Sequence, residues 1–155
     1  MKKIICLVLT VAMLGTCMHV SAAETQTYCT NYNEQYEAYI NICKKMAVKP
    51  ELVLEKNKYN EQDQRHIKVD WNDVSGATDY QLQVSADPAF RNCILDTQRL
   101  AIRGSYYNVL INENKEATYY VRVRPVFSYK YGENYIRVPG RWSNVVVAKG
   151  EDANE

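Results

Sequence analysis

The chain has 155 residues with 19 basic and 18 acidic side chains, a length that allows one domain with a workable core and a small additional segment. Two of the basic residues, Lys2 and Lys3, fall in an expected leader, and without them 17 basic side chains face 18 acidic ones. A dedicated nucleic-acid binder needs a basic excess on one face, so this balance argues against that class.

Residues 1–23 have the three parts of a secretory signal peptide. Lys2 and Lys3 give a positive start, and Ile4 to Met13 is almost entirely apolar. Val20-Ser21-Ala22 has the small-x-small form of a cleavage site. The apolar run is too short for a transmembrane helix. We therefore predict a mature protein that is secreted.

A second export signal overlaps the first. Leu14-Gly15-Thr16-Cys17 resembles the lipobox of bacterial lipoproteins, in which the cysteine is acylated and becomes the mature N-terminus. Thr16 departs from the small residue that usually precedes this cysteine. Lipid attachment at Cys17, with anchoring at the cell surface, is therefore the alternative to free secretion, and the only route by which we expect membrane association.

The mature part keeps three cysteines, Cys29, Cys43 and Cys93. In an oxidising compartment one disulfide can form, which leaves one thiol free or paired with another chain as a disulfide-linked dimer. On an intact helix, about 21 Å of rise would separate Cys29 from Cys43, which is beyond disulfide reach. Either this segment bends back on itself or one of the two cysteines pairs elsewhere.

Residues 24–49 predict a short helix that ends before Pro50. Apolar and tyrosine residues recur at spacings of three and four, as on one face of a helix: they are Cys29, Tyr32, Tyr36, Tyr39, Cys43 and Met46. We expect this stripe to pack on the neighbouring domain. A short coiled-coil dimer and a loosely ordered linker are the alternatives.

From residue 50 onward the spacing of apolar residues changes to two. Ile67, Val69 and Trp71 alternate with polar residues, which predicts a half-buried strand. Similar patterns predict strands at 52–54, 80–85, 93–95, 106–111, from 119, and at 142–147, with a tyrosine-rich hairpin loop at 128–135 and a frayed tail at 150–155. Phe90 is expected to insert into the core. Seven short strands without helices between them predict an all-β sandwich.

Several short motifs follow one another in the part of the chain that is predicted to form strands. Ile67-x-Val-x-Trp71 is followed by Val74-Ser-Gly-Ala-x-x-Tyr-x-Leu-x-Val-Ser85, and then by Asp87-Pro88-x-Phe90. Tyr119-x-Val-Arg-Val-Arg124 and Gly140-Arg-Trp-Ser143 come later. Together these motifs resemble fibronectin type III domains, especially those of secreted bacterial proteins. The resemblance covers residues 50–149 and implies a seven-stranded immunoglobulin-like sandwich, here with a short N-terminal helix.

The resemblance and the alternation together assign roles to individual residues. We expect a structural core that contains Trp71, Tyr80, Leu82, Phe90, Tyr119, Val121 and Val123. The resemblance implies that the Tyr119 hydroxyl anchors the preceding loop, and that Arg122 and Arg124 face outward. Trp142 is expected to stack on one of these arginines as a cation–π pair. Pro125 cannot donate a ladder hydrogen bond, so a bulge or strand end is expected there.

The sequence offers no catalytic constellation. His66 is the one histidine left after the leader, and a catalytic dyad or triad would have to be built around it. The cysteines and His66 lack the paired spacings of zinc sites. Three aspartates are interpreted as a charged turn rather than a calcium site: they are Asp70, Asp73 and Asp79. We expect a protein that is not an enzyme and needs no metal or cofactor.

Tyrosine is in excess, with 13 residues in the chain. Tyr129, Tyr131 and Tyr135 fall on the predicted hairpin loop, where they either pack on the end of the sandwich or offer contact area at low entropic cost. The candidate binding residues are Tyr129, Tyr131, Tyr135, Arg122, Arg124 and Trp142. We predict an interaction module that binds an extracellular protein or assembles at the cell surface. The alternative is a carbohydrate-binding accessory domain that contacts a cell-surface glycan, which coplanar tyrosines would favour and scattered ones would not.

Overall fold

The computed structural model describes residues 34, 36–131 and 133–154. The expected signal peptide at 1–23, with Cys17, lies outside these residues, and so does Cys29. The chain divides into two compact units, Met1–Ile40 and Asn41–Glu155. In the first unit, residues 36–40 are helical. Among the described helices, none combines the length and apolar composition that crossing a membrane requires.

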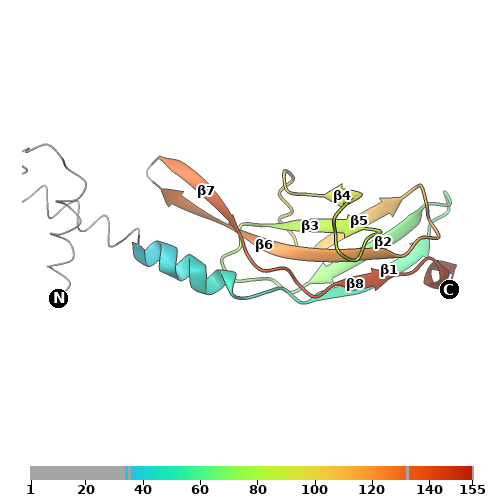
Figure 1. Cartoon of the computed structure of the whole chain (residues 1–155), viewed down its shortest axis with the longest axis horizontal. Helices are drawn as coiled ribbons and strands as arrows, with labels where there is room; N and C mark the ends of the chain where they lie inside the picture. Colours follow the sequence, from blue (N-terminus) through green and yellow to red (C-terminus); the bar gives the residue numbers. More distant parts are fainter. Residues whose placement is uncertain (1–33, 35, 132, 155) are drawn as a thin grey trace, which may run out of the picture. The chain divides into compact units, whose positions relative to one another are not determined.

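The second unit is built from antiparallel strands in two sheets (Figure 1). One sheet has the order β1-β2-β5, with β1 at Leu52–Tyr59, β2 at Arg65–Trp71 and β5 at Tyr106–Ile111. The other has the order β4-β3-β6-β7, with β3 at Asp79–Ser85, β4 at Leu95–Asp96, β6 at Tyr119–Tyr131 and β7 at Asn134–Pro139. A last strand, β8 at Val146–Ala148, also pairs with β6. The predicted all-β class is confirmed.

Alternation along the strands places one face of each sheet in a shared core. Ile67 and Val69 of β2 and Val121 and Val123 of β6 are fully buried and belong to one cluster. The residues expected in the core are at most 8% exposed: Trp71, Tyr80, Leu82, Phe90, Tyr119, Val121 and Val123. Phe90 is buried outside the central cluster. Burying one aliphatic side chain of this core, such as Val121, stabilises the fold by about 1.5–3 kcal/mol.

Tyr119 anchors the loop that precedes β6, as the resemblance implies. Its hydroxyl donates toward the carbonyl oxygens of Asn114 at 3.1 Å and Glu113 at 3.3 Å. Asn114 has a φ of 50°, a left-handed conformation that asparagine tolerates better than most residues. The hydroxyl therefore holds a turn that lacks the glycine usual at such a position.

Arg65 is fully buried, which the sequence did not predict. Its guanidinium donates to Asn57 and to the carbonyl oxygens of Lys115 and Ala117, and its Cζ lies 5.5 Å from the centroid of the Tyr119 ring. Burial lowers its pKa. Because these hydrogen-bond acceptors are neutral, Arg65 fastens the loop before β6 through dipoles and not through an ion pair.

The edge of β6 opposite β3 pairs with a strand that is split into β7 and β8. One strand was expected at 142–147, but β7 ends at Pro139, β8 begins at Val146, and residues 140–145 belong to no strand. Val126 of β6 pairs with Pro139, and Val121 of β6 pairs with Val146. The two β6 residues are five positions apart in the sequence, whereas their two partners are seven positions apart. The connection thus carries two extra residues, and Trp142 lies in it.

Pro125 accounts for where this split falls. A bulge or strand end was expected at Pro125; β6 does not end there but continues through it, paired with Tyr80, and the irregularity lies in the neighbouring connection at 140–145. The N–H of Tyr80 donates to Ile102 at 2.8 Å, on the side away from β6. In an antiparallel pair of this kind, the backbone nitrogens of the two residues face away from each other. The nitrogen of Pro125, which carries no hydrogen, therefore faces the 140–145 connection. The hydrogen bond is therefore lost where β7 and β8 are already separated.

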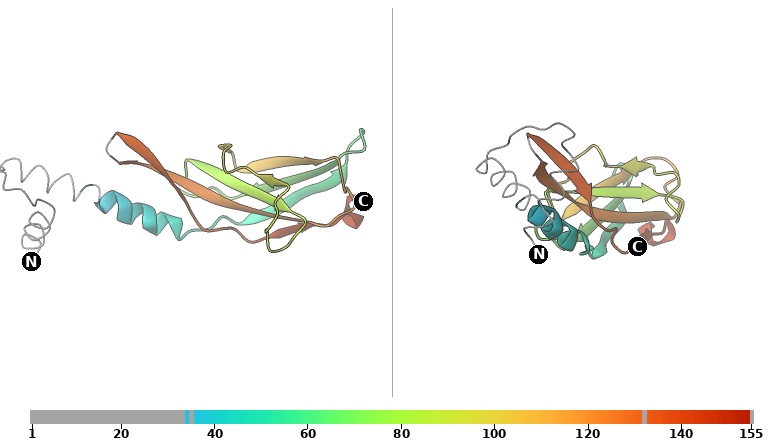
Figure 2. Two further views of the ribbon diagram at one scale, coloured as in Figure 1. Left: turned by 45° about the horizontal axis from the view of Figure 1, so that its top comes forward. Right: turned by 60° about the vertical axis from the view of Figure 1, so that its left-hand side comes forward.

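Beyond Val126, β6 and β7 continue as a two-stranded hairpin, here called the arm, at residues 127–138. β3 pairs with β6 only as far as Val126, while the β6–β7 pairing runs to Tyr131 and Asn134. Figures 1 and 2 show the arm extending past the end of β3. The prediction of a loop at 128–135 is wrong, because most of these residues pair in register on two strands.

The predicted helix is present at 36–46, but its packed face differs from the expected stripe. Ile42 and Met46, four residues apart, contact the core of the second unit. Cys43 is exposed, and Tyr39 is 50% exposed. Successive residues of a helix are rotated by about 100°, so the predicted stripe, which contains Cys43 and not Ile42, lies partly on a neighbouring face of the helix.

The C-terminal residues are not frayed. Glu151–Asn154 form a short 3-10 helix, and Ala153 is only 4% exposed. Gly150 approaches the backbone of Glu116 so closely that a Cβ would lie 2.6 Å from the Glu116 Cα. The tail therefore docks on the loop before β6, and glycine permits the approach.

Cys43 and Cys93 both carry free thiols. The expected internal bridge is therefore not found at either residue. Cys93 is half-buried, and its Sγ lies 3.7 Å from the carbonyl oxygen of Phe90. Burial raises the pKa of this thiol. A disulfide-linked dimer stays a prediction.

Candidate interaction surface

Three predicted binding residues meet on the outer face of the second sheet. The guanidinium carbons of Arg122 and Arg124 lie 4.2 and 4.4 Å from the centroid of the Trp142 ring. Two steps along a strand cover about 7 Å, which matches a flat ring placed between two guanidinium planes. Trp142 therefore fills the space between the arginines, and the expected stack involves both of them.

Backbone contacts of the 140–145 connection fix Trp142. The N–H of Ser143 donates to the Val123 carbonyl at 2.8 Å, and the Ser143 hydroxyl accepts from the Val123 N–H at 3.1 Å. A Cβ at Gly140 would lie 2.8 Å from Pro125 Cγ, so this approach requires glycine. The connection is thereby pinned against β6 on both sides of the tryptophan.

A turn at Asp87 places Phe90 against Arg122. The Asp87 carboxylate accepts from the Ala89 N–H at 3.0 Å and from the Arg91 Nε at 2.7 Å. Phe90 has a φ of 56°, an unusual conformation for an aromatic residue. Its ring centroid lies 4.0 Å from the Arg122 guanidinium carbon. Phe90 thus belongs to the outer-face stack and not to the central core.

Two glutamines that sequence reasoning missed hold the arginines. In the β3–β6 register, Gln83 is opposite Arg122 and Gln81 is opposite Arg124. The Gln83 Oε1 accepts from Nε and Nη2 of Arg122 at 2.9 and 2.7 Å. The Gln81 Oε1 accepts from the Arg124 Nε at 2.8 Å. Each arginine is therefore held by a cross-strand bond as well as by the ring.

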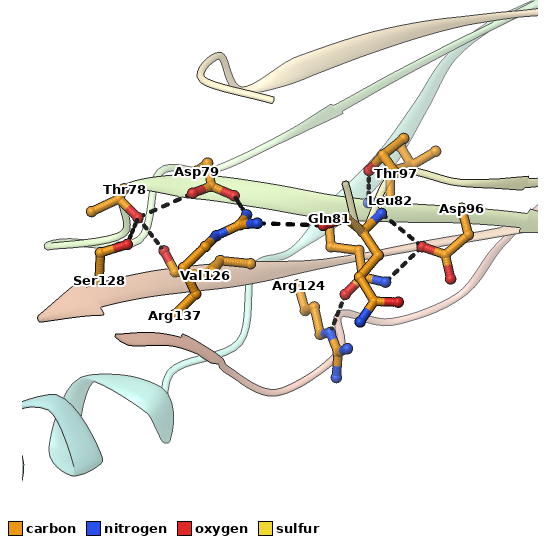
Figure 3. A network of polar contacts seen from close by, with 11 residues as sticks. Thr78, Asp79, Gln81, Leu82, Asp96, Thr97, Arg124, Val126, Ser128 and Arg137 are labelled. Carbon is orange, nitrogen blue, oxygen red and sulfur yellow. Dashed lines mark hydrogen bonds and ion pairs between the residues drawn. The ribbon is translucent and has the colours of Figure 1, made fainter. Parts of the chain in front are cut away.

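Asp96 of β4 orients both glutamines, as Figure 3 shows in part. Its two oxygens accept from the side-chain amides of Gln81 at 2.6 Å and Gln83 at 2.7 Å. Because each glutamine donates to Asp96, its oxygen is directed toward an arginine. The network of Asp96, the two glutamines, the two arginines and Trp142 is here called the Arg–Trp network.

The charges of the Arg–Trp network are uneven. Burial lowers the pKa of Arg122 and of Arg124, although an arginine stays protonated in proteins. Burial raises the pKa of Asp96, but hydrogen bonds from the two glutamines and the Gln98 amide outweigh it, so the net shift is downward. Two cations thus share one carboxylate, which they reach only through neutral amides.

The arm tyrosines do not form one flat surface. Tyr129 pairs with Ile136, and Tyr135 pairs with Lys130, so Tyr129 and Tyr135 lie on opposite faces of the arm. Tyr135 is 72% exposed and shares the outward face with Arg122 and Arg124. Tyr129 is half-buried on the other face. Tyr131 pairs with Asn134, and its side chain is outside the description.

An ion pair fastens the base of the arm to β3. Arg137 of β7 pairs with Asp79, whose side chain is 8% exposed. The Thr78 hydroxyl lies 3.0 Å from the Val126 carbonyl and 3.2 Å from the Ser128 hydroxyl. Figure 3 shows these contacts beside Gln81 and Arg124. The outward face of the arm therefore continues the face that carries the Arg–Trp network.

The other residues considered for chemistry do not converge. His66 Nε2 lies 3.1 Å from Asn108 Oδ1, and Asp70 pairs with Lys68 at 3.7 Å. In the described part of the chain, no three His, Cys, Asp or Glu side chains are placed to hold a metal ion.

A scan against models of known protein families finds no match to this chain, and a search of curated proteins finds no significant similarity.

Proposed function

We propose that this chain is a secreted, non-catalytic interaction module of the fibronectin type III kind, which binds a protein partner through the outer face of β3, β6 and the arm. The signal pattern at 1–23 supports export. The strand orders β1-β2-β5 and β4-β3-β6-β7, the buried Trp71 and the Tyr119 anchor support the family assignment.

The Arg–Trp network is the observation that carries the proposal. Arginine and tryptophan are enriched where proteins bind proteins. Ordering one long side chain on binding costs about 0.5–1.5 kcal/mol. Here Arg122 and Arg124 are already ordered by Trp142 and by their glutamines. A partner therefore meets a surface whose flexible groups are fixed in advance.

A protein partner is favoured over a sugar by the placement of the aromatic rings. A sugar stacks on an open ring face, but the Trp142 ring lies between two guanidinium groups. Tyr129 and Tyr135 lie on opposite faces of the arm and offer no common plane. Tyr135 by itself suits a protein contact, because tyrosine supplies rigid contact area.

A photo-reactive amino acid placed at Lys130 in the exported protein tests the proposal. Lys130 is exposed on the outward face of the arm, opposite Tyr135. Lys56 of β1, exposed on the other sheet, is the matched control position. We expect irradiation of the producing cells to give a protein adduct of discrete mass from position 130 and none from 56. Absent or equal adducts would contradict the proposal, and a glycan adduct would support the carbohydrate alternative.

The export part is tested by the intact mass of the protein recovered outside the cell, before and after reduction and thiol alkylation. We expect an N-terminus at Ala23 or Glu24. A lipid adduct on Cys17 would replace free secretion with anchoring. A doubled mass that collapses on reduction would identify a disulfide-linked dimer.

A further inference from the structure

The outward face of β3, β4, β6 and the arm carries an excess of positive charge. Among the paired strand residues that the structure describes on this face, there are four cations, Arg122, Arg124, Lys130 and Arg137, and two carboxylates, Asp79 and Asp96. The whole chain has a net charge of only +1. Arg137 already neutralises Asp79. Much of the uncompensated charge therefore falls on the Arg–Trp network.

Arg124 keeps hydrogen-bond donors available to a ligand. Its Nε is bound to Gln81, while Nη1 and Nη2 have no hydrogen-bond partner among the described residues. Neither nitrogen is among the buried, unpartnered atoms of the described chain. Nη1 and Nη2 of Arg124 are therefore open to solvent. Arg122 likewise uses only Nε and Nη2 toward Gln83 and leaves Nη1. The free nitrogens of both arginines are held on either side of one ring.

The hydrogen-bond acceptors beneath the arginines are amides, and this choice preserves the charge. Glutamine oxygens orient Arg122 and Arg124 without neutralising them. Glutamates at 81 and 83 would form ion pairs and cancel both cations. The neutral supports therefore leave the positive charge of both arginines available to an anion.

We propose that the Arg–Trp network binds a carboxylate-rich segment of the protein partner, with an aspartate or glutamate side chain accepting from Nη1 and Nη2 of Arg124 and a second carboxylate accepting from Arg122. This inference rests on the proposed function and names the chemistry of its partner. The planar guanidinium fork matches a carboxylate with two parallel hydrogen bonds. An exposed interaction of this kind weakens with salt.

The test uses the mature protein labelled with nitrogen-15 and a capped peptide of eight glutamates. Trp142 and Trp71 provide two indole N–H signals, of which the buried Trp71 is the internal reference. We expect a saturable shift of the Trp142 indole and the Nε–H signals of Arg122 and Arg124, with no shift of Trp71. Raising the salt concentration should weaken the binding, and a capped serine peptide should give no shift.

Two substitutions with the same charge change provide the comparison. Arg124→Gln should weaken the peptide at least fivefold, whereas Lys58→Gln, at an exposed position of β1, should stay within twofold of the parent. If Arg124→Gln also disturbs the Trp71 signal, Arg124→Lys replaces it, and an intermediate loss is expected because the charge remains without the fork. No saturable shift at millimolar peptide, an equal loss in both variants, or equal binding of inorganic sulfate would overturn the proposal.

The result is separable from the test of the proposed function. A protein adduct at position 130 combined with an Arg–Trp network that ignores the glutamate peptide would leave the interaction function standing and remove this inference. A peptide that binds at Arg124 in a protein without adducts would remove the interaction function, and with it the protein partner named here, and would leave the Arg–Trp network as an anion site only.

Discussion

Replacing Asp96 with asparagine should disturb the arginine stack without touching either arginine. The carboxylate accepts from the side-chain amides of Gln81 and Gln83 at 2.6 and 2.7 Å. An asparagine offers one oxygen and one N–H2 group in the same place, so one glutamine amide would then face a second donor. That glutamine must turn over, and its oxygen would leave Arg122 or Arg124.

The cost follows from the bonds that are lost. A hydrogen bond to a charged group contributes about 1.5–3 kcal/mol, and Asp96→Asn weakens one at the carboxylate and another at an arginine. Asp96 is exposed and Arg122 is half-buried, so hydrogen bonds to water replace much of this. We therefore expect the free energy of unfolding to fall by about 1–2 kcal/mol, and by less than about 0.5 kcal/mol for Glu55→Gln, an exposed control on β1.

Urea unfolding with an unchanged slope measures the loss, and the Nε–H signals of Arg122 and Arg124 locate it. We expect faster solvent exchange at one of these two signals in Asp96→Asn. A loss below about 0.5 kcal/mol with both signals unchanged would refute the reasoning, because the glutamines would then be oriented without Asp96.

Three further outcomes follow from the fold, each read by urea titration. Gly150→Ala should lower the free energy of unfolding by about 1–3 kcal/mol, because a Cβ there overlaps the loop before β6. In the control Gly104→Ala the Cβ meets nothing nearer than 3.9 Å, so the free energy of unfolding should change by less than about 0.5 kcal/mol. Equal effects of the two substitutions would contradict the docked tail. Tyr119→Phe should lower the free energy of unfolding by about 0.5–1.5 kcal/mol, because the hydrogen bond from the hydroxyl to the Asn114 carbonyl is lost. An unchanged free energy of unfolding would contradict the role of this hydroxyl in holding the loop. The Arg91 hydrogen bond lowers the pKa of Asp87 to about 2, so its stabilisation is complete above about pH 4 and is lost as the pH falls toward 2. Asp87→Asn should flatten that part of the curve, and an unchanged curve would speak against the turn.

Alternation along the chain was enough to predict most of the fold. Ile67, Val69 and Trp71 alternate with polar residues and are all buried, because a strand covered on one face requires this spacing. The same signal missed the split between β7 and β8, since the two extra residues at 140–145 break the alternation. It also missed the burial of Arg65, because two of the three acceptors of its guanidinium lie about 50 positions further along the chain.

The site was predicted in part for a related reason. Arg122, Arg124 and Trp142 were chosen from their order in the sequence, and the structure brings them together. Gln81 and Gln83 resemble any outward polar residues of a strand, and only the β3–β6 register places them opposite the arginines. Register depends on long-range packing and turn lengths, which local patterns do not report.

The central claim is most directly tested on two exposed tyrosines of opposite sheets. Tyr135 on the arm is 72% exposed and Tyr106 on β5 is 56% exposed, so either can be replaced with serine without opening the core. The measurement is the Kd of each variant for the protein cross-linked at position 130. We predict at least a tenfold loss for Tyr135→Ser, or about 1.4 kcal/mol, and a change within twofold for Tyr106→Ser. Equal Kd values, or a larger loss for Tyr106→Ser, would contradict binding through the arm and the face beside it.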